Sequence, residues 1–193
     1  MTTTDALETL MSSSSQPVHS LPIPPAPAAR DDAPFDKRAF RNILGSFPTG
    51  VTVITTLAQD GSPVGLTANS FNSLSLDPPL ILWSLNSNSP SLVCFENCPN
   101  FNINILAHGQ SGLSRRFATP MAEKFTGVDW HPGGAGVPVL QGCAAVLECT
   151  LVSMQEAGDH ILFIGRVDRF EGLSHPPLAF HAGKYRLLGE QIE

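Results

Sequence analysis

A dense set of short polar side chains stands in the first half of the chain, in 63-PVGLTANSFNSLSLDPPLILWSLN-86. Its hydroxyl and amide groups belong to Thr67, Asn69, Ser70, Asn72, Ser73 and Ser75. A strand that only filled a core would carry Val and Ile at about half of these places. The segment is therefore either a solvated loop or a row of hydrogen-bonding groups that faces a polar ligand.

The other residues that could do chemistry form none of the common catalytic motifs. The chain has no GxxxxGK[ST] phosphate loop, no GxSxG nucleophile turn and no HExxH zinc motif. Gly134 and Gly136 begin a GxGxxG pattern, but Val139 takes the place of the third glycine. The six histidines are scattered. We expect no metal site, and any cofactor must bind by a geometry other than these.

Composition narrows the class of protein. The 193 residues are enough for one domain, and a hydrophobic fraction of 42% is ordinary for a globular chain. The net charge of −6, without a basic cluster, argues against binding to nucleic acid or to an acidic membrane surface. No apolar run approaches the roughly 20 residues of a membrane span. The spacing of the four cysteines favours reduced thiols in or near the core of a cytoplasmic protein: Cys94, Cys98, Cys143 and Cys149.

The chain is expected to divide at about residue 34. Residues 1–34 carry a run of four serines and the segment 22-PIPPAPAA-29, which is typical of a disordered, partly polyproline tail. They lack the basic start and long apolar centre of a secretory signal, and the several arginines of a transit peptide. Residues 35–193 are expected to form the folded domain.

The first element of the domain is predicted to be a helix. Phe40, Ile43, Leu44 and Phe47 recur on one helical face, Asp36 can cap its start, and Gly45 and Pro48 end it. Beyond it, β-branched and apolar runs predict strands, with a hairpin turn at Asp60-Gly61 and a second turn at 156-EAGD-159. The strands are expected at 51–57, 63–68, 80–85, 101–106, 144–154, 160–170 and 178–188. Short helices are expected from Ser89-Pro90 to Asn97 and around 112–118, and a loop over 126–140. Short strands dominate, so the fold is mainly β with a few short helices, and a β-barrel is the leading architecture.

Several strings resemble the flavin reductase family of FMN-binding split barrels. They are GVTVITT, PVGLTANSF, SLDPPLILWSLN, 99-PNFNINIL-106, 123-EKFTGVDW-130, 158-GDHILFIGRV-167 and 177-PLAFHAGKY-185. All occur in the family's order, from about Phe40 to Tyr185. The resemblance implies a homodimeric six-stranded split barrel that binds FMN, or FAD in some members. It also implies reduction of the flavin by NADH or NADPH, and release of reduced flavin to a partner monooxygenase.

The resemblance also implies the site residues. The segment Pro63, Val64, Gly65, Leu66 and Thr67 would lie along the flavin ring, and Asn69 and Ser70 would bond it. The polar chain of the flavin would meet Ser84, Leu85, Asn86, Ser91, Arg116 and Phe117, with the arginine near the phosphate. His160, in the Gly158-Asp159-His160 turn, would border the face on which the nicotinamide stacks.

Other readings of single residues remain open. Pro90 departs from the basic or small polar residue that many members carry there, which leaves the choice between FMN and FAD open. Asn69 and Ser70 could be turn residues, and His160 a polar residue beside a turn. Trp83 and Phe71 are expected to pack in the core. His181 and Tyr185 could approach the dinucleotide, although a strand surface is the simpler interpretation.

The chemistry expected is hydride transfer without a side-chain acid or base, because the flavin accepts the hydride and the protein positions it. No catalytic residue is therefore predicted. Two alternatives stay open from the residues alone: a non-catalytic flavin carrier on the same fold, and a direct flavin-dependent oxidase or oxygenase. The absence of an acid–base pair for an organic substrate speaks against the second.

Overall fold

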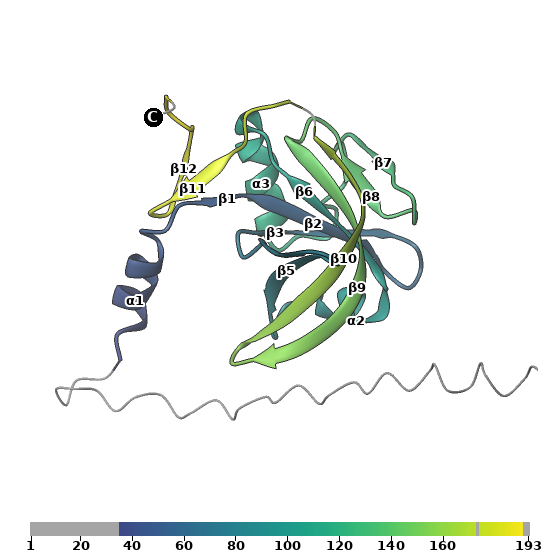
Figure 1. Cartoon of the computed structure of the whole chain (residues 1–193), viewed down its shortest axis with the longest axis horizontal. Helices are drawn as coiled ribbons and strands as arrows, with labels where there is room; N and C mark the ends of the chain where they lie inside the picture. Colours follow the sequence, from purple (N-terminus) through teal and green to yellow (C-terminus); the bar gives the residue numbers. More distant parts are fainter. Residues whose placement is uncertain (1–34, 173, 191–193) are drawn as a thin grey trace, which may run out of the picture. The chain divides into compact units, whose positions relative to one another are not determined.

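The computed structural model describes residues 35–172 and 174–190, and one compact unit spans Asp36–Glu193. The predicted tail at 1–34 lies outside the described residues. Within this unit a curved, fully antiparallel sheet of seven strands dominates (Figure 1). In spatial order its strands are β3 (Pro63–Ala68), β2 (Thr52–Leu57), β6 (Asn100–Ile105), β9 (Ala145–Ala157), β10 (His160–Gly172), β5 (Pro79–Asn86) and β4 (Asn72–Leu76).

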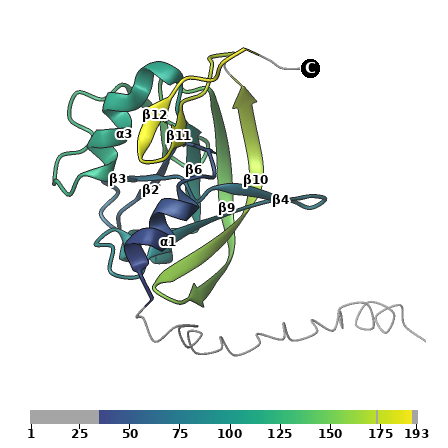
Figure 2. The same cartoon turned by 90° about the vertical axis from the view of Figure 1, so that its left-hand side faces the viewer.

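Smaller elements surround this sheet. A three-stranded sheet consists of β1 (Thr49–Gly50), β11 (Ala179–His181) and β12 (Lys184–Arg186), and a pair consists of β7 (Trp130–Pro132) and β8 (Pro138–Leu140). The helices are α1 (Lys37–Leu44), α2 (Leu92–Asn97), the 3-10 turn η1 (His108–Gln110) and α3 (Ser111–Ala118). In Figure 2, α3 lies with its following loop on the side of the sheet that carries β2 and β3. Among the described residues, no helix is long and apolar enough to cross a bilayer.

The prediction of a mainly β fold with few short helices is confirmed, but the sheets do not close into a barrel and the strand count differs from the six of the expected split barrel. The large sheet has seven strands, and its edge strands β3 and β4 do not pair with each other. Instead, the Ser70 hydroxyl, just after β3, donates to the carbonyl of Ser84 on β5 and accepts from its amide, both at 3.0 Å. A side chain thus links the two sides where backbone pairing stops.

Three predicted elements need correction. The stretch 72–76, which the sequence showed only as a row of polar residues, is the edge strand β4. It pairs with β5 on one side and is largely exposed, so its residues do not alternate between apolar and polar as those of a half-buried strand do. The strand expected at 178–188 is a hairpin, because Ala182 and Gly183 both have positive φ and reverse the chain between β11 and β12. The loop expected at 126–140 contains the β7–β8 pair.

Elsewhere, helix caps and turns form at the residues that the sequence predicts. Asp36 caps α1, because its carboxylate accepts from the amides of Arg38 and Ala39 at 2.8 and 3.0 Å. The Asp60-Gly61 hairpin forms between β2 and β3, with Gly61 at φ 81°. The β9–β10 turn is shorter than expected, with Gly158 and Asp159 alone between the strands.

Two clusters of buried residues make up the core. Inside the curve of the sheet, Trp83 and Phe163 stack with ring centroids 4.3 Å apart, and Phe95 and Phe101 meet the indole edge-on. The expected core position of Trp83 is confirmed, and Phe71 packs against this cluster. The second cluster lies under α3 and the C-terminal hairpin and includes Phe117, Leu140 and Leu178.

The 99-PNFNINIL-106 string is structural in this chain. Phe101 and Ile103 are buried among the first cluster, while Asn102 and Asn104 point to the other face. The Asn104 amide donates to the Val53 carbonyl and its carbonyl accepts from the amide of Leu140, at 3.0 and 2.8 Å. Buried amides that are fully bonded in this way fix one arrangement of neighbouring strands. β6 therefore ties β2 to β8 and sets the frame on which β3 lies.

Candidate ligand site on the outer face of β3

The strand β3 presents alternate residues to opposite sides, as a pleated strand must. Leu66 is buried in the first cluster, with Val64 and Ala68 packed against it. Gly65 and Thr67 face outward, where the Thr67 hydroxyl donates to the Ser114 carbonyl of α3 at 2.7 Å. A Cβ on Gly65 would lie 2.6 Å from the Phe117 ring, so only glycine lets α3 approach the strand this closely. Phe117 itself is buried.

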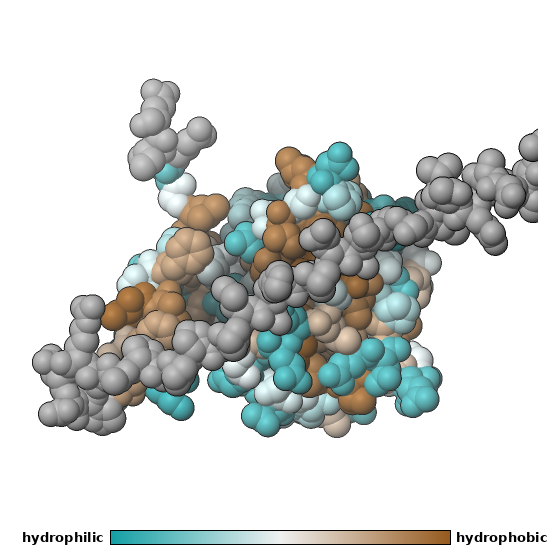
Figure 3. Space-filling model, turned by 60° about the horizontal axis from the view of Figure 1, so that its bottom comes forward, coloured by the Kyte–Doolittle hydropathy of each residue, from teal (hydrophilic) through white to brown (hydrophobic). Residues whose placement is uncertain are grey.

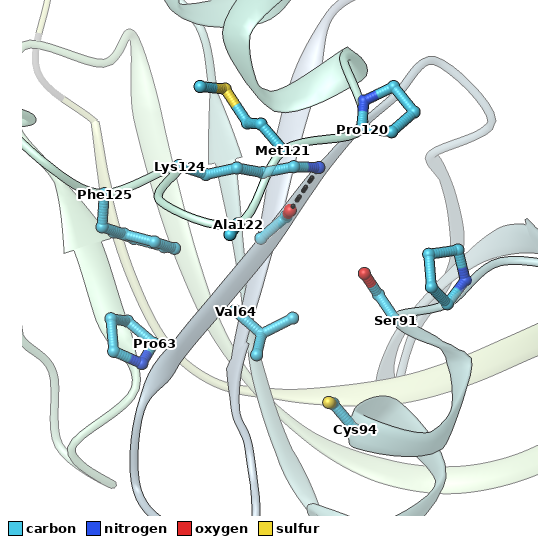
Figure 4. A pocket seen from close by; sticks show the side chains of 11 residues that line it. Pro63, Val64, Ser91, Cys94, Pro120, Met121, Ala122, Lys124 and Phe125 are labelled. Carbon is cyan, nitrogen blue, oxygen red and sulfur yellow. Dashed lines mark hydrogen bonds between the residues drawn. The ribbon is translucent and has the colours of Figure 1, made fainter.

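A cleft of about 490 Å³ opens beside the outward residues near the start of β3 (Figure 4). Three separate parts of the chain line it: β3, the start of α2, and the segment after α3. The lining residues are Pro63, Val64, Gly65, Pro90, Ser91, Cys94, Pro120, Met121, Ala122, Lys124 and Phe125. The volume falls within the range of roughly 300–1,000 Å³ usual for small-molecule sites. The lining is mostly apolar with a few polar groups, as such sites require.

Lys124 closes one side of this cleft. Its ammonium donates to the carbonyls of Phe117 and Gly65, at 2.8 and 3.3 Å (dashed line to Gly65 in Figure 4). Burial lowers the pKa of this half-buried ammonium. In the same view Ser91 and Cys94 lie across the cleft from Lys124. Burial also raises the pKa of the Cys94 thiol, which favours the neutral form.

A smaller cavity of about 180 Å³ lies at the other end of β3. It is lined by Val51, Thr67, Asn69, Ser114, Ala118, Phe180 and Tyr185. The Tyr185 hydroxyl donates to the Ser114 hydroxyl at 2.9 Å, and the Arg115 guanidinium lies 5.2 Å from the centre of the Tyr185 ring. The C-terminal hairpin therefore holds α3 against β3. Tyr185 is half-buried and packs against the second core cluster, and it lines this cavity together with the predicted site residues Thr67 and Asn69.

Arg116 lies elsewhere. It lines a separate cavity of about 500 Å³, together with glycines from η1, α3 and the 127–142 region. Its guanidinium Nη2 donates to the carbonyls of Thr126 and Glu123, at 2.5 and 3.3 Å. Its Nε is buried without a hydrogen-bond partner among the described residues. The side chain thus fastens the segment after α3 to the helix.

The remaining predicted residues gather at the end of β5. His160 pairs with Asn86 across the β5–β10 ladder, and its Nδ1 lies 2.7 Å from Asp159 Oδ1. That hydrogen bond lowers the pKa of the exposed Asp159 carboxyl. The Asn86 side chain accepts from the Asn88 amide at 2.9 Å. Leu85 is buried in the first cluster, so its side chain faces away from this surface.

The structure thus sorts the predicted residues. It brings Pro63, Val64, Gly65 and Ser91 to the 490 Å³ cleft, and Thr67 and Asn69 to the neighbouring small cavity. Leu66, Leu85 and Phe117 are buried, so only their backbone groups can meet a ligand. Ser70 and Ser84 bond to each other. The sequence did not predict that Lys124 and Cys94 line the cleft. Lys124 stands in the string 123-EKFTGVDW-130, whose resemblance to the family implies no role for the lysine itself.

The fold and the cleft together define a small, mainly β domain in which a curved antiparallel sheet carries a cavity beside one edge strand. Residues 44–189 match the family described as "Flavin reductase like domain". The chain belongs to this family.

Individual relatives agree with this membership. The chain is 39% identical over 156 residues to the reductase subunit HsaB of a flavin-dependent monooxygenase from Mycobacterium tuberculosis, covering 79% of this chain and 83% of that protein. It is 41% identical over 156 residues to the FMN reductase (NADH) SmoA from Agrobacterium fabrum, covering 81% and 88%. The structure of the Streptomyces globisporus NADH:FAD oxidoreductase SgcE6 with NAD and FAD fragments has a TM-score of 0.78 at 34% identity, covering 82% and 96%.

Other relatives are longer than this chain. It spans about half (52%) of one Rhizobium meliloti protein and 66% of another, at 42% identity to each.

Proposed function

We propose that this protein is an NAD(P)H-dependent flavin reductase that transfers a hydride to FMN or FAD and supplies reduced flavin to a partner monooxygenase. The observation that carries the proposal is the 490 Å³ cleft, which gathers Pro63, Val64, Gly65 and Ser91 from β3 and the start of α2. These are residues that the family resemblance implies for flavin. The names of SmoA, HsaB and SgcE6 support the same activity.

The lining residues fit a flavin. The half-buried Pro63 and Val64, at the start of β3, are the part of the strand that a flat ring in the cleft can reach, because the Phe117 ring already covers Gly65. Pro63, Val64 and Phe125 supply apolar contact, and Ser91 and Lys124 supply hydrogen-bond donors. When bound, the flavin supplies the electrophilic ring that accepts a hydride.

The protein's contribution in this proposal is to bind and orient. Cys94 and Lys124 are the titratable residues that line the cleft; burial raises the pKa of the Cys94 thiol and lowers the pKa of the Lys124 ammonium. A hydride step needs no proton transfer from either. Positioning the two reactants next to each other is therefore the main task of the site.

The activity is tested by steady-state oxidation of NADH and of NADPH, with FMN, FAD and riboflavin compared as acceptors. A flavin reductase oxidises the nicotinamide in the presence of free flavin. A flavin carrier would bind flavin without oxidising NADH, and a direct oxygenase would need an organic substrate for turnover. Either of these results would replace the proposal.

We also propose that the protein is a homodimer. Helix α1 and the turn after it expose apolar side chains: Ile43 and Leu44 on the helix and Phe47 beyond it are between 57% and 74% accessible. Figure 3 shows hydrophobic side chains gathered over this helix, at the left of the view. The β5–β10 ladder places the half-buried Leu82, Leu162 and Ile164 on its outer face, opposite Trp83 and Phe163. A second copy that presents the same surfaces would cover both.

Light scattering at micromolar concentration tests the dimer. The substitution Ile43→Glu should shift the molar mass toward that of a monomer, whereas Asn42→Glu, which adds the same charge to an adjacent exposed position, should not. A wild-type monomer with full flavin affinity would contradict the dimer. We place the protein in the cytoplasm, a proposal that the four free cysteines support.

A further inference from the structure

Lys124 forms no ion pair with the part of the chain that the structure describes. Its ammonium touches two neutral carbonyls, those of Gly65 and Phe117. The ion pairs among the described residues are His160–Asp159, Arg166–Asp168 and Arg169–Glu148, so Lys124 has no carboxylate within 4.0 Å there. Burial of a charge is costly unless an opposite charge or several hydrogen bonds compensate for it. Two carbonyls compensate in part.

The Lys124 ammonium also has one N–H donor that neither carbonyl uses. It carries three N–H donors, and the two carbonyls take two of them. Figure 4 shows the ammonium on the side of the cleft that faces Ser91. The other residues that line the cleft are neutral at pH 7, since the pKa of the Cys94 thiol is raised by burial. Lys124 therefore gives the cleft its single positive charge.

From this we infer that Lys124 pairs with the negative charge of the ligand in the cleft, and so sets the affinity of the site for anionic flavin. The inference rests on the proposed function. Arg116, the residue that the family resemblance implies near the phosphate, lines a different cavity and bonds to the carbonyls of Glu123 and Thr126. The charge available to the cleft thus comes from Lys124.

One ligand offers two sources of this charge. The phosphate of FMN or FAD is anionic in both redox states, and the flavin ring acquires negative charge when it is reduced. Both chemistries ask for the same partner, a donor that carries a positive charge, and a charged hydrogen bond is stronger than a neutral one. The two sources differ in which ligands lose affinity when the charge is removed.

The test uses Lys124→Gln, which removes the charge and keeps an N–H donor for the carbonyls, and Lys124→Arg, which keeps the charge. Lys184→Gln, at an exposed lysine of β12 outside the cleft, is the matched control. Calorimetry measures the dissociation constants of FMN and riboflavin in oxidised form and, under anaerobic conditions with dithionite, in reduced form. Thermal unfolding of each variant without ligand reports whether the segment after α3 stays in place.

We expect Lys124→Gln to weaken FMN by about tenfold to a hundredfold, Lys124→Arg to recover part of the loss, and Lys184→Gln to change nothing. A loss confined to FMN in both redox states assigns the charge to the phosphate. A loss confined to the reduced forms of both flavins assigns it to the ring. Either result supports the inference.

Three results would overturn it. Lys124→Gln could bind every ligand as tightly as the wild type. It could weaken all four ligands equally while lowering the unfolding temperature, which would make Lys124 a structural clamp only. A wild-type protein that binds no flavin at all would overturn the proposed function, and the inference with it.

Discussion

Two cavities on either side of the segment after α3 look alike in size but differ in chemistry. The cleft on β3 measures about 490 Å³ and the cavity beside α3 about 500 Å³, and each has one cation on its wall. Lys124 donates to carbonyls of β3 and α3, whereas Arg116 donates to carbonyls of the segment that carries Lys124 itself. Arg116 thus fastens the segment, and Lys124 joins it to the predicted flavin strand.

The comparison teaches that two cations eight positions apart can have different hydrogen-bond partners and face different cavities. Lys124 stands in the string 123-EKFTGVDW-130, and Arg116 is a site residue that the family resemblance implies. Their hydrogen-bond partners separate them, because a guanidinium that reaches two loop carbonyls is turned toward the loop. The following substitutions test this difference, in order of decreasing expected effect.

The largest effect is expected at the glycines of the two cavities. Gly65→Ala would place a methyl group 2.6 Å from the Phe117 ring, whereas Gly112→Ala on α3 would meet nothing within 4 Å. We expect Gly65→Ala to lower the free energy of unfolding by about 1–3 kcal/mol and to impair flavin binding. Gly112→Ala should raise stability by about 0.5–1 kcal/mol, because alanine favours a helix. Denaturant unfolding measures both; equal stability of the two variants would contradict the close contact of α3 with β3.

Ligand protection of a thiol should distinguish the cavities next. Cys94 lines the β3 cleft and Cys98, one helical turn later, does not. Bound FMN should slow the reaction of Cys94 with a maleimide by about tenfold at a flavin concentration ten times the dissociation constant. Cys98 should react at the same rate with and without FMN.

The two other cysteines are the internal control of that experiment. Burial raises the pKa of Cys143 to about 11 and that of Cys149 to about 12, so their thiolates are scarce at pH 8. Both should stay unlabelled in the folded protein. Mass spectrometry of the peptides gives each rate; protection of Cys98 and not of Cys94 would place the flavin outside the cleft.

Arg116→Ala should act on the segment rather than on the phosphate. Loss of its bonds to Glu123 and Thr126 is expected to cost about 0.5–1.5 kcal/mol of stability and to weaken FMN and riboflavin by the same factor. Arg115→Ala, which removes an exposed neighbouring charge, is the control. A selective loss of FMN over riboflavin in Arg116→Ala would return Arg116 to the phosphate, as the family resemblance implies.

The smallest effect is expected at His160, which lines neither cavity. If its ring meets the nicotinamide, His160→Ala should raise the KM for NADH a few-fold and slow hydride transfer, as loss of about one hydrogen bond predicts. Flavin affinity should stay unchanged, because the cleft residues lie on other elements. Rapid-mixing measurement of flavin bleaching gives the rate. An unchanged rate and KM would make His160 a polar residue beside a turn.

Much of the fold could be predicted because it depends on neighbouring residues. The cap at Asp36, the hairpin at Asp60-Gly61 and the alternation along β3 follow from hydrogen bonds and periodicity within a few positions. The edge strand β4 could not be predicted in the same way, since its side chains are largely exposed and its strand conformation depends on hydrogen bonds to β5. The seven-strand count therefore depends on tertiary pairing.

The candidate site, like the fold, has features that the sequence predicts and features that depend on tertiary contacts. By its motifs alone, the sequence determined the family, the strand β3 and the residues Gly65 and Ser91 that line the cleft. Only the tertiary structure decided that Leu66, Leu85 and Phe117 are buried, that Arg116 lies beside another cavity, and that Lys124 reaches Gly65 across 59 positions of sequence. The physical reason is that a motif records which residue types stand together along the chain. The partner that satisfies each charge and hydrogen bond is chosen in three dimensions.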